Sequence, residues 1–291
     1  MLYYRAIALS LLMLSVGAAS ALGGETLPDG AAPPYAPVGQ LDVTAPAGGF
    51  RGSGTLIASD WVLTAGHLVD DASSVTFTVG GAVYTGAEWL SHPLWTGDLL
   101  AGYDVGLVRL CEPVAGVSPA VRHAGGGEVG ALGTLVGYAA IGQNVLDAGC
   151  TPGANGAPLI LLTDFDDPPE ADASQTPLGV EYFLGPGDSG GAVFIDPGSG
   201  PVLAGVNSFI ASGGEVAGHG RVAAFNAWID DILGVPGPGE ELAPYAPCDD
   251  GEAPTHPQPM MLPVTPEPAT MALLATGLAA GLVRRRRRRR A

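Results

Sequence analysis

The chain has 291 residues, of which 45 are Gly and 26 are Pro, and 47% are hydrophobic. So many turn-forming residues exclude a bundle of long helices, while the hydrophobic share excludes a disordered chain. Many short strands joined by tight turns explain both numbers, so we expect an all-β chain with one large or two small domains. The formal net charge is −17, and seven of the 12 basic residues form the run 284–290.

Residues 1–21 have the composition of a secretory signal peptide. Arg5 precedes a mostly apolar run, and small residues follow up to Ala21. This order at a chain end is typical of an export signal rather than of a buried helix. We expect cleavage after Ala21 and a protein that leaves the cytoplasm.

Two segments of the first half supply a base and a carboxylate. Residues 54–67 predict two short strands around a turn, and the second strand runs into His67. Residues 103–110 place Asp104 at the start of an alternating strand. Asp98 is a rival carboxylate, but the regular alternation that follows Asp104 favours Asp104.

A Gly-rich loop, residues 185–191, presents Ser189 just before an apolar strand. A serine hydroxyl is a poor nucleophile at neutral pH, so it needs an imidazole base and a carboxylate that orients the imidazole. His67 and Asp104 can fill these roles. The glycines allow the N–H groups of Gly187 and Ser189 to point at one position, where an oxyanion would develop.

Three short segments carry a family resemblance, in the order His, Asp, Ser: Thr64-Ala65-Gly66-His67, Asp104-Val105-Gly106-Leu107 and Gly187-Asp188-Ser189-Gly190-Gly191. Together they strongly resemble the trypsin-like (chymotrypsin-fold) serine endopeptidases, over residues 38–233. The resemblance implies two six-stranded antiparallel β-barrels and a C-terminal helix. His67 and Asp104 would come from the first barrel and Ser189 from the second. It also implies hydrolysis of a protein or peptide substrate through an acyl-enzyme, without a cofactor.

The resemblance also implies a substrate pocket. Phe183 stands where trypsins carry the Asp of the pocket floor, which disfavours cleavage after Arg or Lys. Ile210 stands where a pocket-wall Gly is frequent and would narrow the pocket, while Gly220 would keep another wall open. Ser208 stands beside the catalytic Asp, and Phe209 belongs to the strand that holds the substrate backbone. We expect a small or medium apolar residue before the scissile bond.

Activation is left open by the resemblance. In zymogen members a freed Ile or Val amino terminus pairs with the Asp before the Ser, here Asp188. No Arg or Lys followed by Ile-Val-Gly-Gly occurs near the expected mature start. Either a different terminus engages Asp188, or the site is preorganised without cleavage. A disulfide common in animal members is also missing, since Gly52 and Leu68 occupy its positions.

The remaining candidate ligands do not predict a metal site. Three cysteines allow at most one intramolecular disulfide, and Cys111 with Cys150 is the favoured pair because Cys248 lies in a presumed linker. None of these cysteines has zinc-site spacing. We expect packing or surface roles for His92, His123, His219 and His256, and a solvated acidic turn rather than a calcium site at Asp164, Asp166 and Asp167.

The C-terminal third contains a helix, a spacer and a sorting segment. Residues 223–233 place apolar side chains on one helical face, and residues 234–263 are a Pro-rich linker. Residues 264–291 contain Pro-Glu-Pro, a short apolar stretch at 269–283 and the Arg run. Fifteen helical residues span about 22 Å, less than the ~30 Å hydrocarbon core, so we expect transient contact rather than a stable transmembrane helix.

This terminal arrangement closely resembles the PEP-CTERM protein-sorting signal. In that family an exosortase in the envelope of Gram-negative bacteria cuts the segment and delivers the protein to the cell surface or exterior. Removal of both chain ends leaves four Arg against nearly all of the 29 carboxylates. Such an acidic body should repel nucleic acid and anionic membranes.

Three functions compete at this point. The leading hypothesis is a secreted serine endopeptidase. A catalytically inactive surface binding module with a protease fold is the alternative, since fold does not guarantee function. The joint presence of Ser189, His67 and Asp104 argues against such a module. Hydrolysis of esters by the same site is the third possibility.

Overall fold

The computed structural model describes residues 25–26, 34–165, 178, 181–211 and 216–234. The expected signal peptide, the linker beyond residue 234 and the sorting segment lie outside these described residues, as do Asp166, Asp167 and His256. No helix within the described ranges is long and apolar enough to cross a membrane.

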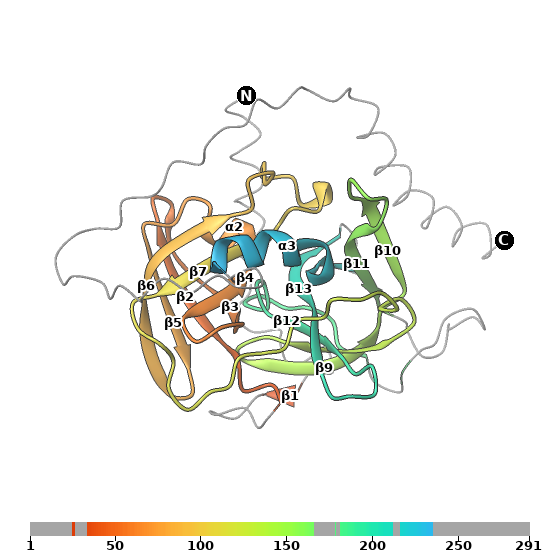
Figure 1. The fold of residues 1–291 in the computed structure, drawn as a ribbon, viewed down its shortest axis with the longest axis horizontal. Helices are drawn as coiled ribbons and strands as arrows, with labels where there is room; N and C mark the ends of the chain where they lie inside the picture. The colour runs from red at the N-terminus through yellow and green to blue at the C-terminus, as the bar shows by residue number, and fades with distance from the viewer. Residues whose placement is uncertain (1–24, 27–33, 166–177, 179–180, 212–215, 235–291) are drawn as a thin grey trace. The chain divides into compact units, whose positions relative to one another are not determined.

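Six strands close into a first barrel in the order β2-β3-β4-β7-β6-β5 (Figure 1). The predicted strand pair around the Ser59-Asp60 turn is confirmed as β3 and β4, where Thr55 lies opposite Leu63. In β5, burial alternates along the strand, so Val75, Phe77 and Val79 face the interior. The six strands are β2 (Val38–Ala45), β3 (Gly48–Leu56), β4 (Trp61–Thr64), β5 (Ser74–Val79), β6 (Ala82–Ser91) and β7 (Gly106–Leu110).

The second half of the chain, joined by the N-terminal strand β1, forms an eight-stranded sheet among the described residues, in the order β1-β9-β8-β12-β13-β14-β11-β10. The all-β fold is therefore confirmed, but the second unit differs from the expected six-stranded barrel. Strands β1 and β10 are added at the two edges, and β9 and β11 are linked by a side chain rather than by strand pairing, since Nδ2 of Asn144 donates to the carbonyl of Asp164 at 2.8 Å. The eight strands are β1 (Glu25–Thr26), β8 (Leu132–Val136), β9 (Ala140–Val145), β10 (Ala148–Pro152), β11 (Pro158–Asp164), β12 (Ala192–Ile195), β13 (Val202–Ile210) and β14 (Val216–Arg221).

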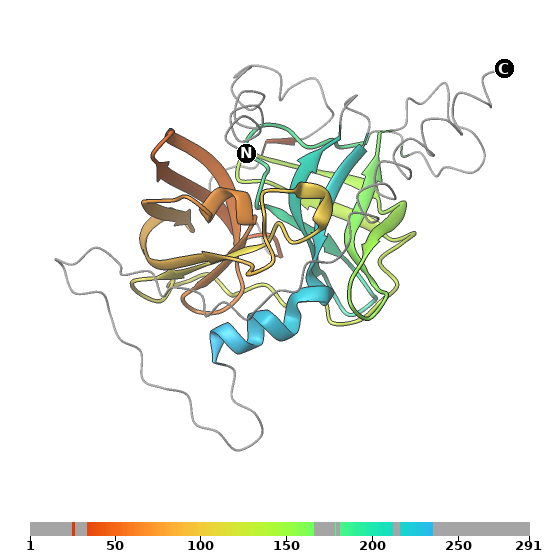
Figure 2. The same ribbon diagram turned by 90° about the horizontal axis from the view of Figure 1, so that it is seen from above.

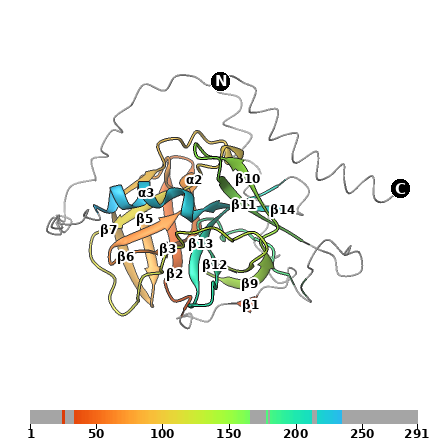
Figure 3. The same cartoon turned by 45° about the vertical axis from the view of Figure 1, so that its right-hand side comes forward.

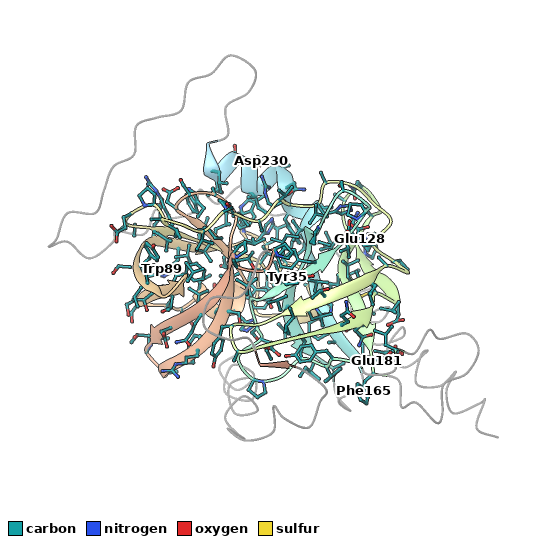
Figure 4. The ribbon with its side chains drawn as sticks, turned by 90° about the horizontal axis from the view of Figure 1, so that it is seen from below. Tyr35, Trp89, Glu128, Phe165, Glu181 and Asp230 are labelled. Carbon is teal, nitrogen blue, oxygen red and sulfur yellow. The ribbon has the colours of Figure 1, made fainter. Side chains whose placement is uncertain are left out.

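The barrel and the sheet lie side by side and share a core (Figure 2). Tyr35, just before β2, lies between them in Figure 4, with its ring 5.2 Å from that of Phe194 on β12. Its hydroxyl donates to Thr134 on β8 at 3.3 Å. The first barrel is therefore packed against the second sheet by aromatic side chains as well as by strand residues.

The predicted C-terminal helix is confirmed as α3 (Val222–Leu233). Phe225 and Ile229 are buried, and Gly234 ends the helix in the left-handed conformation with φ of 60°. The ring of His92 lies 5.3 Å from Phe225 and 4.8 Å from Trp228, so α3 packs back on the first half of the chain (Figure 3).

The expected disulfide between Cys111 and Cys150 is wrong. Cys111 is disulfide-bonded, whereas Cys150 is a free thiol. The two cysteines belong to different units, because Cys111 follows β7 of the barrel and Cys150 lies in β10 of the sheet. Cys248 is the third cysteine of the chain and lies outside the described residues.

Candidate active site

Strand pairing in the first barrel brings His67 and Asp104 together. His67 lies in α2 (Gly66–Val69) directly after β4, and Asp104 lies just before β7, which pairs with β4. The Nδ1 of His67 is 2.8 Å from Oδ2 of Asp104, and the backbone N–H of His67 donates to Oδ1 at 2.7 Å. Gly66 permits this approach, because a Cβ there would meet Asp104 Oδ1 at 3.3 Å and the Val105 backbone at 3.1 Å.

The environment of this pair suits a general base. Asp104 is 2% exposed, and its Oδ2 also accepts a hydrogen bond from the Ser208 hydroxyl at 2.5 Å. Burial lowers the pKa of His67, but the charge of Asp104 and its hydrogen bond raise it, and the net pKa is above the usual 6.5. The carboxylate holds a proton on Nδ1, so Nε2 of the 22% exposed ring can accept one.

The loop that carries Ser189 is docked on the first barrel. The backbone N–H of Ser53 in β3 donates to the carbonyl of Ser189 at 2.7 Å. Gly190 has φ of 80°, and a Cβ there would lie 2.2 Å from both the Ser53 carbonyl and Thr64 Oγ1. Thr64 ends the strand that leads to His67, so the close approach brings Ser189 to the side of the barrel where His67 lies.

A second contact from Ser53 orders the start of the loop. Its hydroxyl donates to the carbonyl of Gly187 at 2.7 Å and accepts from the N–H of Tyr138 at 2.9 Å. Gly187 itself has φ of 97°, a value that favours glycine. The sequence did not indicate this role, because Ser53 lies 134 residues from Gly187 along the chain.

The backbone of this loop leaves two donors free in the described part of the chain. Asp188 N–H donates to Gly185 at 3.1 Å, Gly190 N–H to Asn207 at 2.7 Å and Gly191 N–H to Asp188 at 2.9 Å. The N–H groups of Gly187 and Ser189 have no acceptor among the described residues. These are the two donors that the sequence suggested for an oxyanion.

The predicted pocket residues fall into two places. Phe209 and Ile210 end β13, where Ile210 is 44% exposed and the Phe209 ring covers Gly218. A Cβ on Gly218 would lie 2.2 Å from that ring. A Cβ on Gly220 would instead meet the Val105 side chain at 3.0 Å and the Asp104 carbonyl at 3.7 Å, away from Phe209. A register shift between β13 and β14 at 207–209 separates the two glycines, and no sequence pattern predicted it.

Phe183 lies in an apolar setting. It is 4% exposed and packs in a hydrophobic cluster of the second sheet that includes Leu184. Its ring is 6.2 Å from that of Phe165, which Figure 4 labels at one end of the sheet. An apolar ring therefore occupies the position where trypsins carry a carboxylate.

The other ionisable candidates have structural partners. Asp98 accepts from the N–H of Leu100 at 3.0 Å and caps η2 (Leu99–Ala101), whereas Asp104 is the carboxylate bonded to His67. His219 is fully buried, bonded to Asn207 at 3.0 Å and to Thr163 at 3.1 Å. Across the ranges that the structure describes, no three His, Cys, Asp or Glu side chains are grouped to hold a metal ion.

A closed barrel beside a second sheet, with a His–Asp pair on one and a Ser loop docked from the other, is the arrangement of the chymotrypsin fold. The chain belongs to the trypsin family, whose model, described as Trypsin, matches residues 32–229. A second model, the PEP-CTERM protein-sorting motif, matches residues 264–289. Both resemblances suggested by the sequence are thereby confirmed.

Individual relatives are more distant. Chymotrypsin-like elastase family member 1 from Canis lupus familiaris and its counterpart from Macaca fascicularis are each 36% identical over an alignment of 72 residues, which covers 21% of this chain. The match spans only 28% and 27% of those relatives. A solved structure titled HL collagenase is similar with a TM-score of 0.59 and 22% identity, over 73% of this chain and 98% of that one. At this identity the likeness shows the fold alone.

Proposed function

We propose that this chain is a secreted serine endopeptidase in which Ser189 is the nucleophile, His67 the general base and Asp104 the orienting carboxylate. The observation that carries the proposal is the hydrogen-bonded arrangement around Asp104, which holds the ring and the backbone of His67 at 2.8 and 2.7 Å. A buried carboxylate in this position fixes the imidazole tautomer and stabilises its cation.

In the proposed reaction, Ser189 Oγ attacks the peptide carbonyl carbon while Nε2 of His67 takes the hydroxyl proton. The carbonyl π electrons move to oxygen, and this oxyanion accepts hydrogen bonds from the N–H groups of Gly187 and Ser189. Collapse of the intermediate breaks the C–N bond, and His67 gives its proton to the leaving amine. Water then attacks the acyl-enzyme by the same route and releases Ser189.

We further propose that cleavage follows a small or medium apolar residue. The apolar surroundings of Phe183 support this preference, since a buried cationic side chain needs a paired charge. Phe209 and the half-exposed Ile210 would contact the substrate from β13. Profiling with a peptide library would contradict this preference if Arg or Lys dominated before the scissile bond.

For localisation, we propose export through residues 1–21 and sorting through the C-terminal motif. The motif supports recognition by an exosortase-type enzyme, and removal of residues after it would strip the Arg run from the acidic body. Mass spectrometry of both ends of the protein purified from its native host would locate the two cleavages. An unprocessed C-terminus would contradict the sorting proposal.

The enzymatic proposal is tested with purified wild-type protein, casein, a peptide library and a p-nitrophenyl ester. We expect turnover by the wild type, covalent labelling of Ser189 by a fluorophosphonate, and neither for Ser189→Ala. Ser73→Ala is the matched control, because Ser73 is exposed and its hydroxyl donates to the Thr44 carbonyl at 3.0 Å in the first barrel. Equal turnover by the wild type and Ser189→Ala would overturn the assignment.

A further inference from the structure

Asp188 stands between Gly187 and Ser189, the residues of the two proposed oxyanion donors. Its side chain, however, is buried in the second half of the molecule. Asp188 is 4% exposed, and its Oδ2 accepts hydrogen bonds from the Tyr182 hydroxyl at 2.5 Å and from the Gly185 N–H at 2.7 Å. A Cβ on Gly137 would lie 1.9 Å from its Oδ1, so the end of β8 is shaped around this carboxylate.

Tyr182 is itself held firmly by β9. Its N–H donates to the carbonyl of Gln143 at 2.8 Å, and its carbonyl accepts from Nδ2 of Asn144 at 3.2 Å. Its Cβ lies directly over Gly142, where an added Cβ would be only 2.2 Å away. The hydroxyl of a 3% exposed side chain with these contacts has little freedom to move.

We infer that Tyr182 is a positioning residue of the active site, which sets the oxyanion loop by anchoring Asp188 to β9. The inference rests on the proposed function of Ser189 and names a residue that supports it. Movement of the Asp188 side chain out of its site would shift the two peptides that flank Asp188. The 188–189 peptide carries the N–H of Ser189, and the 187–188 peptide is joined to Gly187, whose N–H lies in the next peptide along. The hydroxyl of Tyr182 therefore acts on the oxyanion through the backbone, without touching the substrate.

The electrostatics agree with this geometry. Burial raises the pKa of Asp188 to about 6, while the hydrogen bonds from Tyr182 and Gly185 act to lower it. An ionised carboxylate in this position depends on its donors, since a buried unpaired charge is costly. Loss of the Tyr182 hydroxyl would leave Oδ2 with one donor from the described residues.

Tyr182→Phe tests the inference, with Tyr84→Phe as the matched control. Tyr84 is also a buried tyrosine, at 7% exposure, but its hydroxyl accepts from the Ala115 N–H in the first barrel. Turnover of an apolar peptide p-nitroanilide is normalised to sites labelled by a fluorophosphonate. We expect kcat of Tyr182→Phe to fall roughly 10- to 100-fold with KM within about twofold, because the lost interaction acts on the transition state.

A peptide aldehyde gives a second readout, because its addition product with Ser189 places an oxygen where the oxyanion forms. Its inhibition constant should rise in Tyr182→Phe by about the same factor as kcat falls. A merely structural role would lower the labelled fraction and leave kcat per labelled site unchanged, and that result would overturn the inference. Inactivity of the wild type would instead overturn the proposed function.

A second variant covers the case in which Tyr182→Phe does not fold. Asp188→Asn keeps the size of the side chain but weakens its interaction with both donors. We expect the same change in kcat without a change in KM. Where both single variants fold, we combine them. The kcat of the double variant should be less than about threefold below that of Asp188→Asn alone, because both changes break the same interaction. Two independent effects that multiply would contradict the inference.

Discussion

The barrel and the sheet contribute to the site by different means. The first barrel is closed by backbone pairing, and its largest fully buried side chains are apolar, such as Leu41, Leu63 and Phe77. The second sheet buries polar groups that hydrogen-bond one another, including Asn207 and His219. The His–Asp pair therefore depends on strand register, whereas the Ser loop depends on glycines and side-chain hydrogen bonds.

The largest effect is expected where the barrel contributes chemistry, at Asp104. Asp104→Asn keeps the size of the side chain, but an amide N–H facing Nδ1 would favour the wrong imidazole tautomer. We expect kcat to fall by roughly 10³ to 10⁴. Because the charge and hydrogen bond of Asp104 raise the pKa of His67, the variant should also show an acid limb of activity at lower pH.

The measurement is the pH profile of kcat/KM for wild type and Asp104→Asn. The wild type should lose activity as the pH falls through a value above 6.5, where His67 becomes protonated. Ser91→Ala serves as the control, since its hydroxyl bonds Asp70 at 3.1 Å on the surface. An unchanged kcat in Asp104→Asn would show that the orientation of His67 does not depend on this carboxylate.

On the sheet side, the glycine dependence is tested by Gly190→Ala against Gly198→Ala. Both glycines have positive φ, of 80° and 98°, but only Gly190 would clash, at 2.2 Å from Ser53 and Thr64. Gly198→Ala should cost about 1–2 kcal/mol from the backbone alone. Gly190→Ala should cost about 1–3 kcal/mol more and displace Ser189.

Urea unfolding and turnover are measured for both variants. Together they distinguish the cost of a positive φ, which both glycines share, from the loss of the contact between the Ser loop and the barrel, which concerns Gly190 alone. We expect Gly198→Ala to retain wild-type kcat and Gly190→Ala to lose most of it. Equal stability and equal activity of both variants would mean that the close approach of the loop to β3 and β4 is not needed.

The two parts of the site also differ in how far the sequence could predict them. His67, Asp104 and Ser189 stand in short local motifs, so their strands and loops were predictable from spacing. Tyr182 and Ser53 act through contacts with residues distant in sequence or on other strands, and their immediate neighbours carry no motif. Local pattern indicates the residues for which we propose catalytic roles, whereas the hydrogen bonds that hold these residues appear only once the strands are paired.

The pairing of the sheet strands also decides how much of the pocket and of the disulfide could be predicted from the sequence. The open pocket wall at Gly220 stays a prediction, whereas the glycine that lies under the Phe209 ring is Gly218. The irregular register at 207–209, which offsets β14 against β13, leaves no mark on residue type. Cys150 and Cys111 were paired by elimination, although they belong to different units. Both outcomes depend on long-range geometry rather than on composition.

Buried polar groups should make the stability of the sheet depend on pH. Burial lowers the pKa of His219 to about 3, so between pH 6.5 and 3 the unfolded state binds a proton that the folded state does not. Stability then falls as the pH falls, by about 1.4 kcal/mol per pH unit. Asp188 has the opposite effect between pH 3.8 and about 6. In this range the carboxyl group is protonated in the folded state and ionised in the unfolded state, so stability rises as the pH falls.

Urea unfolding at several pH values between 4 and 6 separates these effects. His219→Gln should remove the loss on acidification, and Asp188→Asn should remove the opposing gain. Leu63→Val in the first barrel should lower stability by about 1 kcal/mol at every pH, because it changes only apolar packing. Parallel pH profiles for wild type and His219→Gln would show that His219 is not buried in its neutral form.

The smallest effect is expected at Cys150, on the hairpin of β10 and β11 that lies far from the Ser loop in sequence. Burial raises the pKa of its thiol, so it should react slowly with iodoacetamide at neutral pH. Cys150→Ser should leave kcat and KM unchanged, since β10 is an edge strand that, among the described strands, pairs with β11 alone. A loss of activity comparable to that of Gly190→Ala would show that this edge also sets the Ser loop, and that the sheet acts as one unit.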